Sequence, residues 1–247
     1  MPKIKLAAVE YLNTIPFIKS IERSSLFESV EFILDYPSRC AEHFRDRHVD
    51  LALVPVGALH EFSNYQIVTD YCIGCNGKVA TVLLVSENPI QDLNTVFLDY
   101  QSRTSVRLIQ ILMRDYWRKN ISFSRAEKGY EKEIKGGVGG LIIGDRAFNA
   151  SGEFPFVYDL GECWKKLTGL PFVFAVWVCH AGLNSEVPFK LNEAFQLGLS
   201  DLDKMNIRFG GLGAKEIERY FSENIDYLFD EKKKLAMKKF LNYEIDL

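Results

Sequence analysis

The 247-residue chain has the composition of a globular protein, with 47% hydrophobic and 26% charged residues, and it is long enough for one large domain or two ordinary lobes. Its formal net charge of −3 argues against the broad basic surface that nucleic-acid binding requires. No apolar stretch approaches the roughly 20 residues that span a membrane, and the opening run Ile4–Val9 is too short for a signal-peptide core. We therefore expect a cytoplasmic protein with neither a nucleic-acid nor a membrane partner.

Short apolar runs alternate with helical patterns through the first 180 residues, which is typical of an α/β fold with parallel strands joined by helices. Several runs are apolar throughout, as expected where helices cover both faces of a sheet. From Pro188 onward the pattern is helical, and Gly210, Gly211 and Gly213 separate two long predicted helices. The predicted strands are Ile4–Val9, Glu31–Asp35, Leu51–Val54, Ile67–Ile73, Val79–Ser86, Thr95–Asp99, Leu141–Ile143, Phe156–Tyr158 and Phe172–Cys179.

A weak internal repeat of the order strand, polar turn, helix suggests two lobes that face one cleft. The first strand leads to Asn13-Thr14 and a helix, and the strand Thr95–Asp99 leads to the turn 102–105 and a helix. Residues 79–86 and 172–179 are the candidate crossover strands, without a Pro/Gly linker, so we expect a two-strand hinge. The predicted division is 1–85 plus 177–247 for lobe one, which includes the C-terminal helices, and 86–176 for lobe two, with the ligand cleft between them.

The five cysteines do not form a disulfide framework, because their number is odd and the chain is large. Cys72 and Cys75 form a C-x-x-C pair, but Gly74, Asn76 and Gly77 indicate a turn rather than the helix start of a redox motif. A zinc site would need a second pair or a histidine partner at ligand spacing. We expect unpaired thiols and no metal site.

Short polar side chains follow the predicted strands, where an open parallel sheet binds its ligand. Asn13 and Thr14 follow strand one, Ser38 is a predicted N-cap after Pro37, and Thr81 lies on a crossover strand. In the segment QSRTS, Ser102 precedes Thr104 and Ser105, either of which is a predicted cap for the next helix. Each alone is typical of ordinary helix capping, but together they predict a site that binds carboxylates without bulk positive charge.

Motifs for cofactor chemistry are absent from the sequence. There is no Walker loop, no G-x-G-x-x-G after the first strand, no H-E-x-x-H and no G-x-S-x-G. The histidines lie outside the predicted cleft segments, and we interpret them as structural. We expect no metal, nucleotide, nicotinamide or other cofactor.

The sequence resembles the chorismate dehydratase family. The similarity rests on YLNTIPF (11–17), DLALVPVGAL (50–59), IGCNGKVATVLLVS (73–86), LDYQSRTSVRLI (98–109), LIIGDRAF (141–148) and YDLGECWKKLTGLPFVFAVW (158–177). It implies a two-lobed type II periplasmic-binding-protein-like fold and a lyase that converts chorismate into 3-[(1-carboxyvinyl)oxy]benzoate in the futalosine route to menaquinone. Ala80-Thr81 stand where the family often has Ser-Val or similar, so Thr81 is a less secure hydroxyl donor.

The implied dehydration needs a base, an acid for the leaving hydroxyl and charge stabilisation. The motif side chains are neutral and poor bases, so we hypothesise that the enolpyruvyl carboxylate of the substrate takes the proton. Asn13 would orient the reacting region, while Ser38, Thr104 and Ser105 bind carboxylates; Asp145 is the rival acid or base. A non-catalytic solute binder and a cytoplasmic carboxylate sensor remain alternatives, and we expect a monomer or weak dimer.

Overall fold

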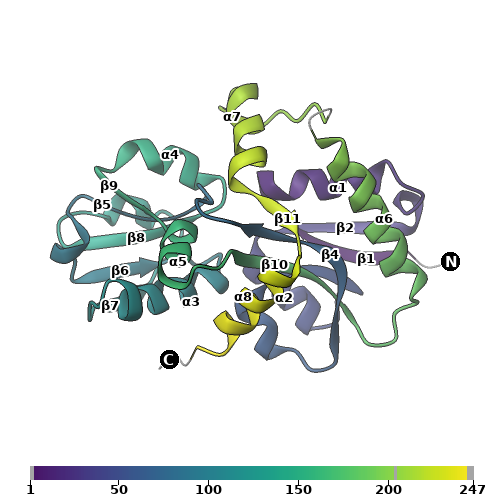
Figure 1. Cartoon of the computed structure of the whole chain (residues 1–247), viewed down its shortest axis with the longest axis horizontal. Helices are drawn as coiled ribbons and strands as arrows, with labels where there is room; N and C mark the ends of the chain where they lie inside the picture. The colour runs from purple at the N-terminus through teal and green to yellow at the C-terminus, as the bar shows by residue number, and fades with distance from the viewer. Residues whose placement is uncertain (1–2, 203–204, 244–247) are drawn as a thin grey trace.

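The computed structural model describes residues 3–202 and 205–243, which form two lobes, each built on its own mixed sheet (Figure 1). In lobe one the strand order is β11-β4-β10-β3-β1-β2. These strands are β1 Ile4–Val9, β2 Val30–Asp35, β3 Leu51–Pro55, β4 Tyr65–Cys75, β10 Phe172–His180 and β11 Asp226–Leu228. In lobe two the order is β7-β6-β8-β5-β9. These are β5 Val82–Ser86, β6 Thr95–Leu98, β7 Ser122–Arg125, β8 Val138–Ile143 and β9 Phe156–Asp159.

Helices cover both faces of each sheet, which explains why so many strands are apolar throughout. In lobe one, α1 and α6 lie on one side of the sheet and α2 and α8 on the other (Figure 1). In lobe two, α4 covers one face, and α3 and α5 cover the other. The helices are α1 Ile15–Glu22, α2 Pro37–Arg45, α3 Thr104–Ile111, α4 Arg146–Glu153, α5 Leu160–Thr168, α6 Glu186–Ser200, α7 Ala214–Arg219 and α8 Glu231–Leu241.

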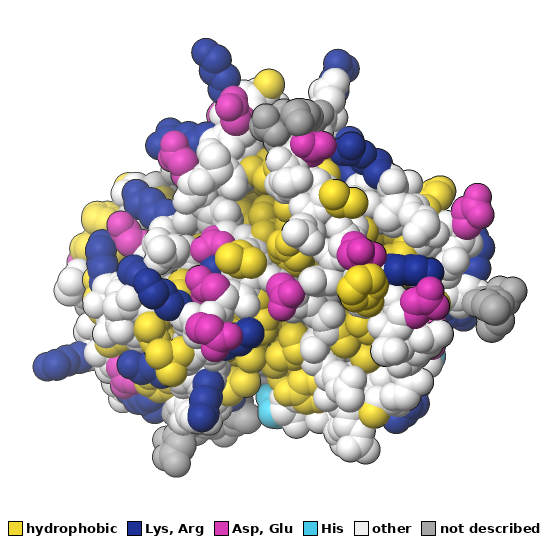
Figure 2. All heavy atoms as spheres, turned by 45° about the vertical axis from the view of Figure 1, so that its right-hand side comes forward, with side chains coloured by type: hydrophobic (Ala, Val, Ile, Leu, Met, Phe, Trp, Pro, Cys, Tyr) yellow, Lys and Arg dark blue, Asp and Glu magenta, His cyan; other side chains and the backbone are white. Residues whose placement is uncertain are grey.

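One hydrophobic core runs continuously from lobe one into the α3 and α5 side of lobe two. Its centre in lobe one is an aromatic cluster in which Phe17 of α1 contacts Trp177 of β10 and Phe195 of α6, with ring centroids 5.5 and 4.4 Å apart. Around this core, charged side chains of both signs are interspersed over the face drawn in Figure 2, in keeping with the net charge of −3. Within the described part of the chain, no helix is both long and apolar enough to cross a membrane.

The α/β prediction is confirmed, and each predicted strand overlaps an observed one. The sheets are mixed rather than parallel, because β10 runs antiparallel to β3 and β4, and β5 runs antiparallel to β8 and β9. The prediction of two long C-terminal helices is wrong. Instead, α6 is followed by the short α7, a π-helical turn over Tyr220–Asn224, the edge strand β11 and then α8.

The chain changes lobe earlier than the boundaries expected from the sequence. All of β5 pairs inside the lobe-two sheet, and all of β10 pairs inside the lobe-one sheet. The two connections between the sheets are therefore residues 76–81 and 169–171, before the expected boundaries at 85/86 and 176/177. The apolar runs 79–86 and 172–179 each begin near a connection, so periodicity alone could not separate the connecting residues from the strand.

Candidate active site

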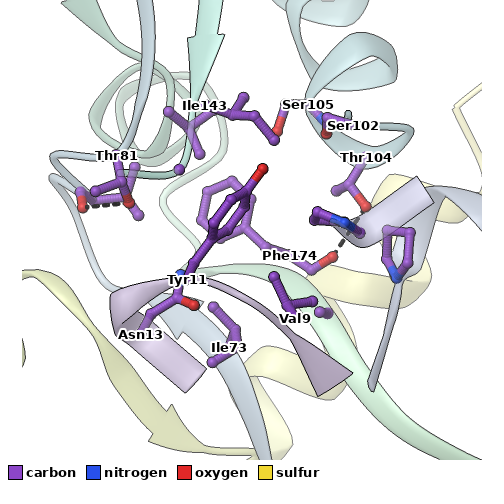
Figure 3. Close-up of a pocket in the computed structure, with 16 residues that line it drawn as sticks. Val9, Tyr11, Asn13, Ile73, Thr81, Ser102, Thr104, Ser105, Ile143 and Phe174 are labelled. Carbon is purple, nitrogen blue, oxygen red and sulfur yellow. Dashed lines mark hydrogen bonds between the residues drawn. The ribbon is translucent and has the colours of Figure 1, made fainter. Parts of the chain in front are cut away.

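A narrow cavity lies between the lobes, close to both connections (Figure 3). Its volume is about 50 Å³, which holds only a few water molecules. Segments far apart in the sequence meet there, and no Lys, Arg, Asp or Glu is among the described lining residues. These residues are Val9, Tyr11, Asn13, Pro37, Pro55, Ile73, Val79, Thr81, Val82, Ser102, Thr104, Ser105, Ile143, Gly144, Phe174 and Ala175.

Asn13 lies in a 3-10 turn, Leu12–Thr14, that joins β1 to α1. The Thr14 hydroxyl donates to Asn13 Oδ1 at 3.1 Å, and the Tyr227 hydroxyl donates to the Asn13 carbonyl oxygen at 2.8 Å. Thr14 is buried and does not line the cavity, so its hydroxyl orients Asn13 instead of facing a ligand. Pro16 lies in the first turn of α1, as expected.

The start of α3 brings three of the predicted residues to the cavity. Neither Thr104 nor Ser105 is the N-cap of α3, which is Arg103. The side chain that accepts an N–H of the first turn is that of Ser102, whose Oγ accepts from the Ser105 N–H at 2.9 Å. Thr104 Oγ1 instead accepts from the Gly57 N–H and donates to the Phe174 carbonyl oxygen, both at 2.9 Å, which ties α3 to lobe one. The Ser105 hydroxyl points into the cavity (Figure 3) and has no hydrogen-bond partner among the residues that the structure describes.

Ser38 is not the N-cap of α2, which is Tyr36. The chain enters this helix two residues earlier than the sequence suggested, because Pro37 occupies the first turn. The Ser38 hydroxyl donates to the Tyr100 carbonyl oxygen at 3.3 Å, and its N–H donates to the Gln101 carbonyl oxygen at 3.0 Å. Ser38 therefore joins α2 to the loop before α3, and only its neighbour Pro37 lines the cavity.

Thr81 ends the first connection between the lobes. It follows Ala80, whose φ of +64° lies in the left-handed region that a non-glycine residue seldom adopts. The Asp159 carboxylate holds this conformation by accepting the N–H groups of Val79 and Ala80, at 3.0 and 2.7 Å. Thr81 Oγ1 lies 3.0 Å from the hydroxyl oxygen of Tyr220.

Asp145 precedes α4 but makes no capping hydrogen bond with its side chain. Its carboxylate oxygens instead accept the backbone N–H of Leu12 from the opposite lobe, at 3.1 and 3.2 Å. Burial raises the pKa of Asp145 to about 6, against the lowering effect of the Leu12 hydrogen bond. Asp145 does not line the cavity, and this arrangement makes it a clamp between the lobes.

Tyr11 is a site residue to which the sequence analysis assigned no role. Its ring stands in the middle of the cavity (Figure 3), and its hydroxyl donates to Gln101 Oε1 at 2.7 Å. Arg146 Nη2 donates to the same oxygen at 2.9 Å and also pairs with buried Asp99. Arg146 is thus joined to the Tyr11 hydroxyl through Gln101. The one sequence signal was the position of Tyr11 at the head of the YLNT motif.

Packing keeps most aromatic side chains of residues 158–177 out of the cavity. Phe174 lines it, whereas Trp164, Phe172 and Trp177 are core residues. Arg103 pairs with Glu61 and Glu42 in a second cavity of about 620 Å³ that adjoins the first at Ser102.

All five cysteines are buried free thiols, which confirms the prediction of unpaired thiols. No metal-like cluster of His, Cys, Asp or Glu occurs among the described residues.

A family model described as menaquinone biosynthesis matches residues 4–244, almost the whole chain. The chain belongs to this family. Two of the similar curated proteins are chorismate dehydratases. The one from Thermus thermophilus is 32% identical over 128 residues, which is 45% of this chain and 46% of that protein. The one from Campylobacter jejuni is 24% identical over 243 residues, 94% of each chain. The resemblance found in the sequence is confirmed at the level of the family.

Solved structures show that the fold is periplasmic-binding-protein-like. A protein from Archaeoglobus fulgidus gives a TM-score of 0.70 at 14% identity, covering 97% of this chain and 95% of that one. The periplasmic aliphatic sulphonate-binding protein from Escherichia coli gives 0.60 at 15% identity, covering 97% and 91%. A Candida albicans protein described as having the generic periplasmic-binding-protein fold gives 0.62 at 13% identity, covering 100% and 92%.

Proposed function

We propose that this protein is a chorismate dehydratase that removes water from chorismate to give 3-[(1-carboxyvinyl)oxy]benzoate, in the cytoplasm and in the futalosine route to menaquinone. The family and both named relatives support this activity. The observation that carries the proposal is the convergence of neutral polar side chains from both lobes on one cavity. They are Asn13, Thr81, Ser102, Thr104 and Ser105.

The reaction needs little from the protein beyond positioning. The C3–H bond breaks, its electron pair completes the aromatic ring, and the C4–O bond breaks so that the hydroxyl group and the proton leave as water. Aromatisation supplies much of the driving force. Since no charged side chain of the described chain lines the cavity, the enolpyruvyl carboxylate of the substrate is the proposed base, and no cofactor takes part.

Asn13 and Ser105 have the clearest proposed roles. The Thr14 hydroxyl donates to Asn13 Oδ1, which leaves the amide N–H groups of Asn13 as the donors that orient the reacting region. The free Ser105 hydroxyl lies at the N-terminus of α3, where a carboxylate gains from the helix dipole and the unpaired amides. Each hydrogen bond to a carboxylate adds about 1.5–3 kcal/mol.

Asp145 is better suited to clamp the lobes than to act as the base. Its carboxylate already accepts the Leu12 N–H, and it stands outside the cavity lining. Its pKa of about 6 would suit proton transfer near neutral pH, which is the reason to test it. The variant Asp145→Asn distinguishes a role in holding the lobes together from a role in proton transfer.

The structure corresponds to a closed form in this proposal. A cavity of about 50 Å³ is smaller than the roughly 300–1,000 Å³ of typical ligand pockets. Chorismate would therefore require the lobes to separate along residues 76–81 and 169–171, with Tyr11 withdrawn from the centre. Closure then excludes water from the bound substrate.

The direct test is to mix the purified protein with chorismate, follow the loss of diene absorbance and identify the product by NMR. Formation of the carboxyvinyloxy benzoate with no added cofactor supports the proposal. A heat-denatured sample controls for the slow spontaneous decay of chorismate. Binding of chorismate by calorimetry without conversion would favour a non-catalytic binder or sensor instead.

A further inference from the structure

Two buried tyrosines of the C-terminal segment lie directly behind the candidate site. Tyr220 begins the π-helical turn Tyr220–Asn224, and Tyr227 lies in the edge strand β11 beside β4. Their exposed fractions are 2% and 8%. No sequence motif marks this segment, and neither tyrosine lines the cavity itself.

The two hydroxyl groups contact two candidate site residues from behind. Tyr220 OH lies 3.0 Å from Thr81 Oγ1, and Tyr227 OH donates to the Asn13 carbonyl oxygen at 2.8 Å. Burial raises the pKa of Tyr220, whereas hydrogen bonds with the side chains of Thr81 and Asn13 lower it. Tyr220 OH thus lies beside the Thr81 hydroxyl of the inter-lobe connection and near the side chain of Asn13, which belongs to the turn after β1.

One assignment of donors satisfies this whole set of groups. Asn13 Oδ1 accepts from Thr14, so the group that the Asn13 side chain can offer to the Tyr220 oxygen is its amide N–H. The Thr81 hydroxyl donates to the Val79 carbonyl oxygen at 3.4 Å, which leaves Thr81 Oγ1 to accept from the Tyr220 O–H. The second N–H of Asn13 then remains available to a ligand.

The aromatic ring of Tyr220 is fixed by both lobes. It packs edge-on against Phe148 of α4 in lobe two, with ring centroids 5.1 Å apart, and beside its neighbour Phe221. The π-helical turn that begins at Tyr220 is an uncommon element that often occurs at functional sites. Because the ring is packed independently of its hydroxyl, loss of the hydroxyl alone leaves most of the packing in place.

We propose that Tyr220 is a positioning residue of the active site, whose hydroxyl holds the Asn13 amide and the Thr81 hydroxyl in register with the substrate when the lobes are closed. This inference rests on the proposed dehydratase function and deepens it. It assigns the C-terminal segment to the catalytic site, although that segment contributes nothing to the cavity lining.

The test compares chorismate turnover by the wild-type protein, Tyr220→Phe and the control Tyr158→Phe. The control removes a hydroxyl that accepts a hydrogen bond from the Ile90 N–H at 2.9 Å and does not line the cavity. Tyr220→Phe should lower kcat by about tenfold to a hundredfold while KM changes less than about threefold. Tyr158→Phe should keep the wild-type kcat.

A double-mutant cycle excludes a simple loss of folding. Thr81→Val removes the same hydrogen bond from its other end, so the double variant should be no slower than the slower single variant. An active wild-type protein with unchanged kcat in Tyr220→Phe would overturn this inference alone. Additive losses in the cycle would also overturn it. A wild-type protein that does not convert chorismate would overturn the proposed function together with it.

Discussion

The backbone N–H of Leu12 donates to the Asp145 carboxylate at 3.1 Å, and this contact joins the turn that carries Asn13 to the lobe opposite. Asp145 and Leu12 are 133 residues apart in the chain. The bond can form only when the lobes are close, so it links the position of the candidate catalytic amide to lobe closure. In the proposed closing motion, this bond and the candidate site would therefore form together.

Replacing Asp145 with Asn should change how stability depends on pH. Because the pKa of Asp145 is raised to about 6 from about 4 in the unfolded chain, the folded protein binds more protons in this window, and ionisation weakens folding as the pH rises through it. Thermal unfolding from pH 4 to 7 should show the wild-type Tm falling relative to Asp145→Asn, levelling above about pH 6. Parallel Tm curves would show that Asp145 is not titrating there.

The same variant separates a clamp from a catalytic acid or base. Asn keeps an oxygen that accepts the Leu12 N–H, so a clamp role predicts that turnover falls by less than about tenfold. Complete loss of turnover with unchanged chorismate affinity would identify Asp145 as the proton-transfer group and remove the motivation for the substrate carboxylate as base.

Substitution of Gly144 by Ala should obstruct the closed site. Gly144 has φ +65°, and a Cβ there would lie 2.5 Å from the Tyr11 ring. Gly136→Ala is a matched control, since its φ is also positive, +56°, but nothing lies within 4 Å of its Cβ. Both variants should lose about 1 kcal/mol of stability to backbone strain, and Gly144→Ala should lose chorismate turnover as well. Equal turnover in the two variants would argue against a close Tyr11–Gly144 contact.

Loss of the Ser105 hydroxyl should weaken substrate binding. If this free hydroxyl binds a carboxylate, Ser105→Ala removes about 1.5–3 kcal/mol and raises KM or the dissociation constant by roughly tenfold or more. The exposed Ser200, whose hydroxyl donates only to the Leu197 carbonyl oxygen, provides the control Ser200→Ala. Calorimetric affinities that agree between the two variants would remove Ser105 from the binding site.

The buried strands could be predicted from the sequence because they leave continuous apolar runs. Phe172–His180 is such a run, and it forms the centre of the lobe-one sheet. Two short edge strands were missed. Ser122–Arg125 is a short, mostly polar edge strand, and Asp226–Leu228 has only three residues, so neither produces a hydrophobic pattern that can be distinguished from a loop.

The cavity residues could be predicted only in part, because motifs identify residues but not their partners. Asn13, Thr81, Ser102, Thr104 and Ser105 do meet at one cavity. The cap of α3 was assigned wrongly, since several neighbouring residues have the same capping chemistry and the backbone path decides between them.

No local sequence pattern predicts the contacts that Tyr220 and Tyr227 make with the candidate site. Tyr220 meets Thr81 over a separation of 139 residues, and Tyr227 meets Asn13 over 214. Contacts of this kind are set by how the C-terminal segment returns to β4, which hydrophobic periodicity does not encode. They become visible only when the tertiary structure places both ends together.

The most direct test of the central claim is single-turnover kinetics with Asn13→Ala alongside chorismate affinity measured by calorimetry. The matched control is Asn192→Ala, whose amide donates to Asp70 on the surface of lobe one. If neutral groups position the substrate for its own proton transfer, Asn13→Ala should slow the chemical step by about a hundredfold and change affinity by less than about tenfold, while Asn192→Ala matches the wild type. An unchanged rate in Asn13→Ala would contradict the account.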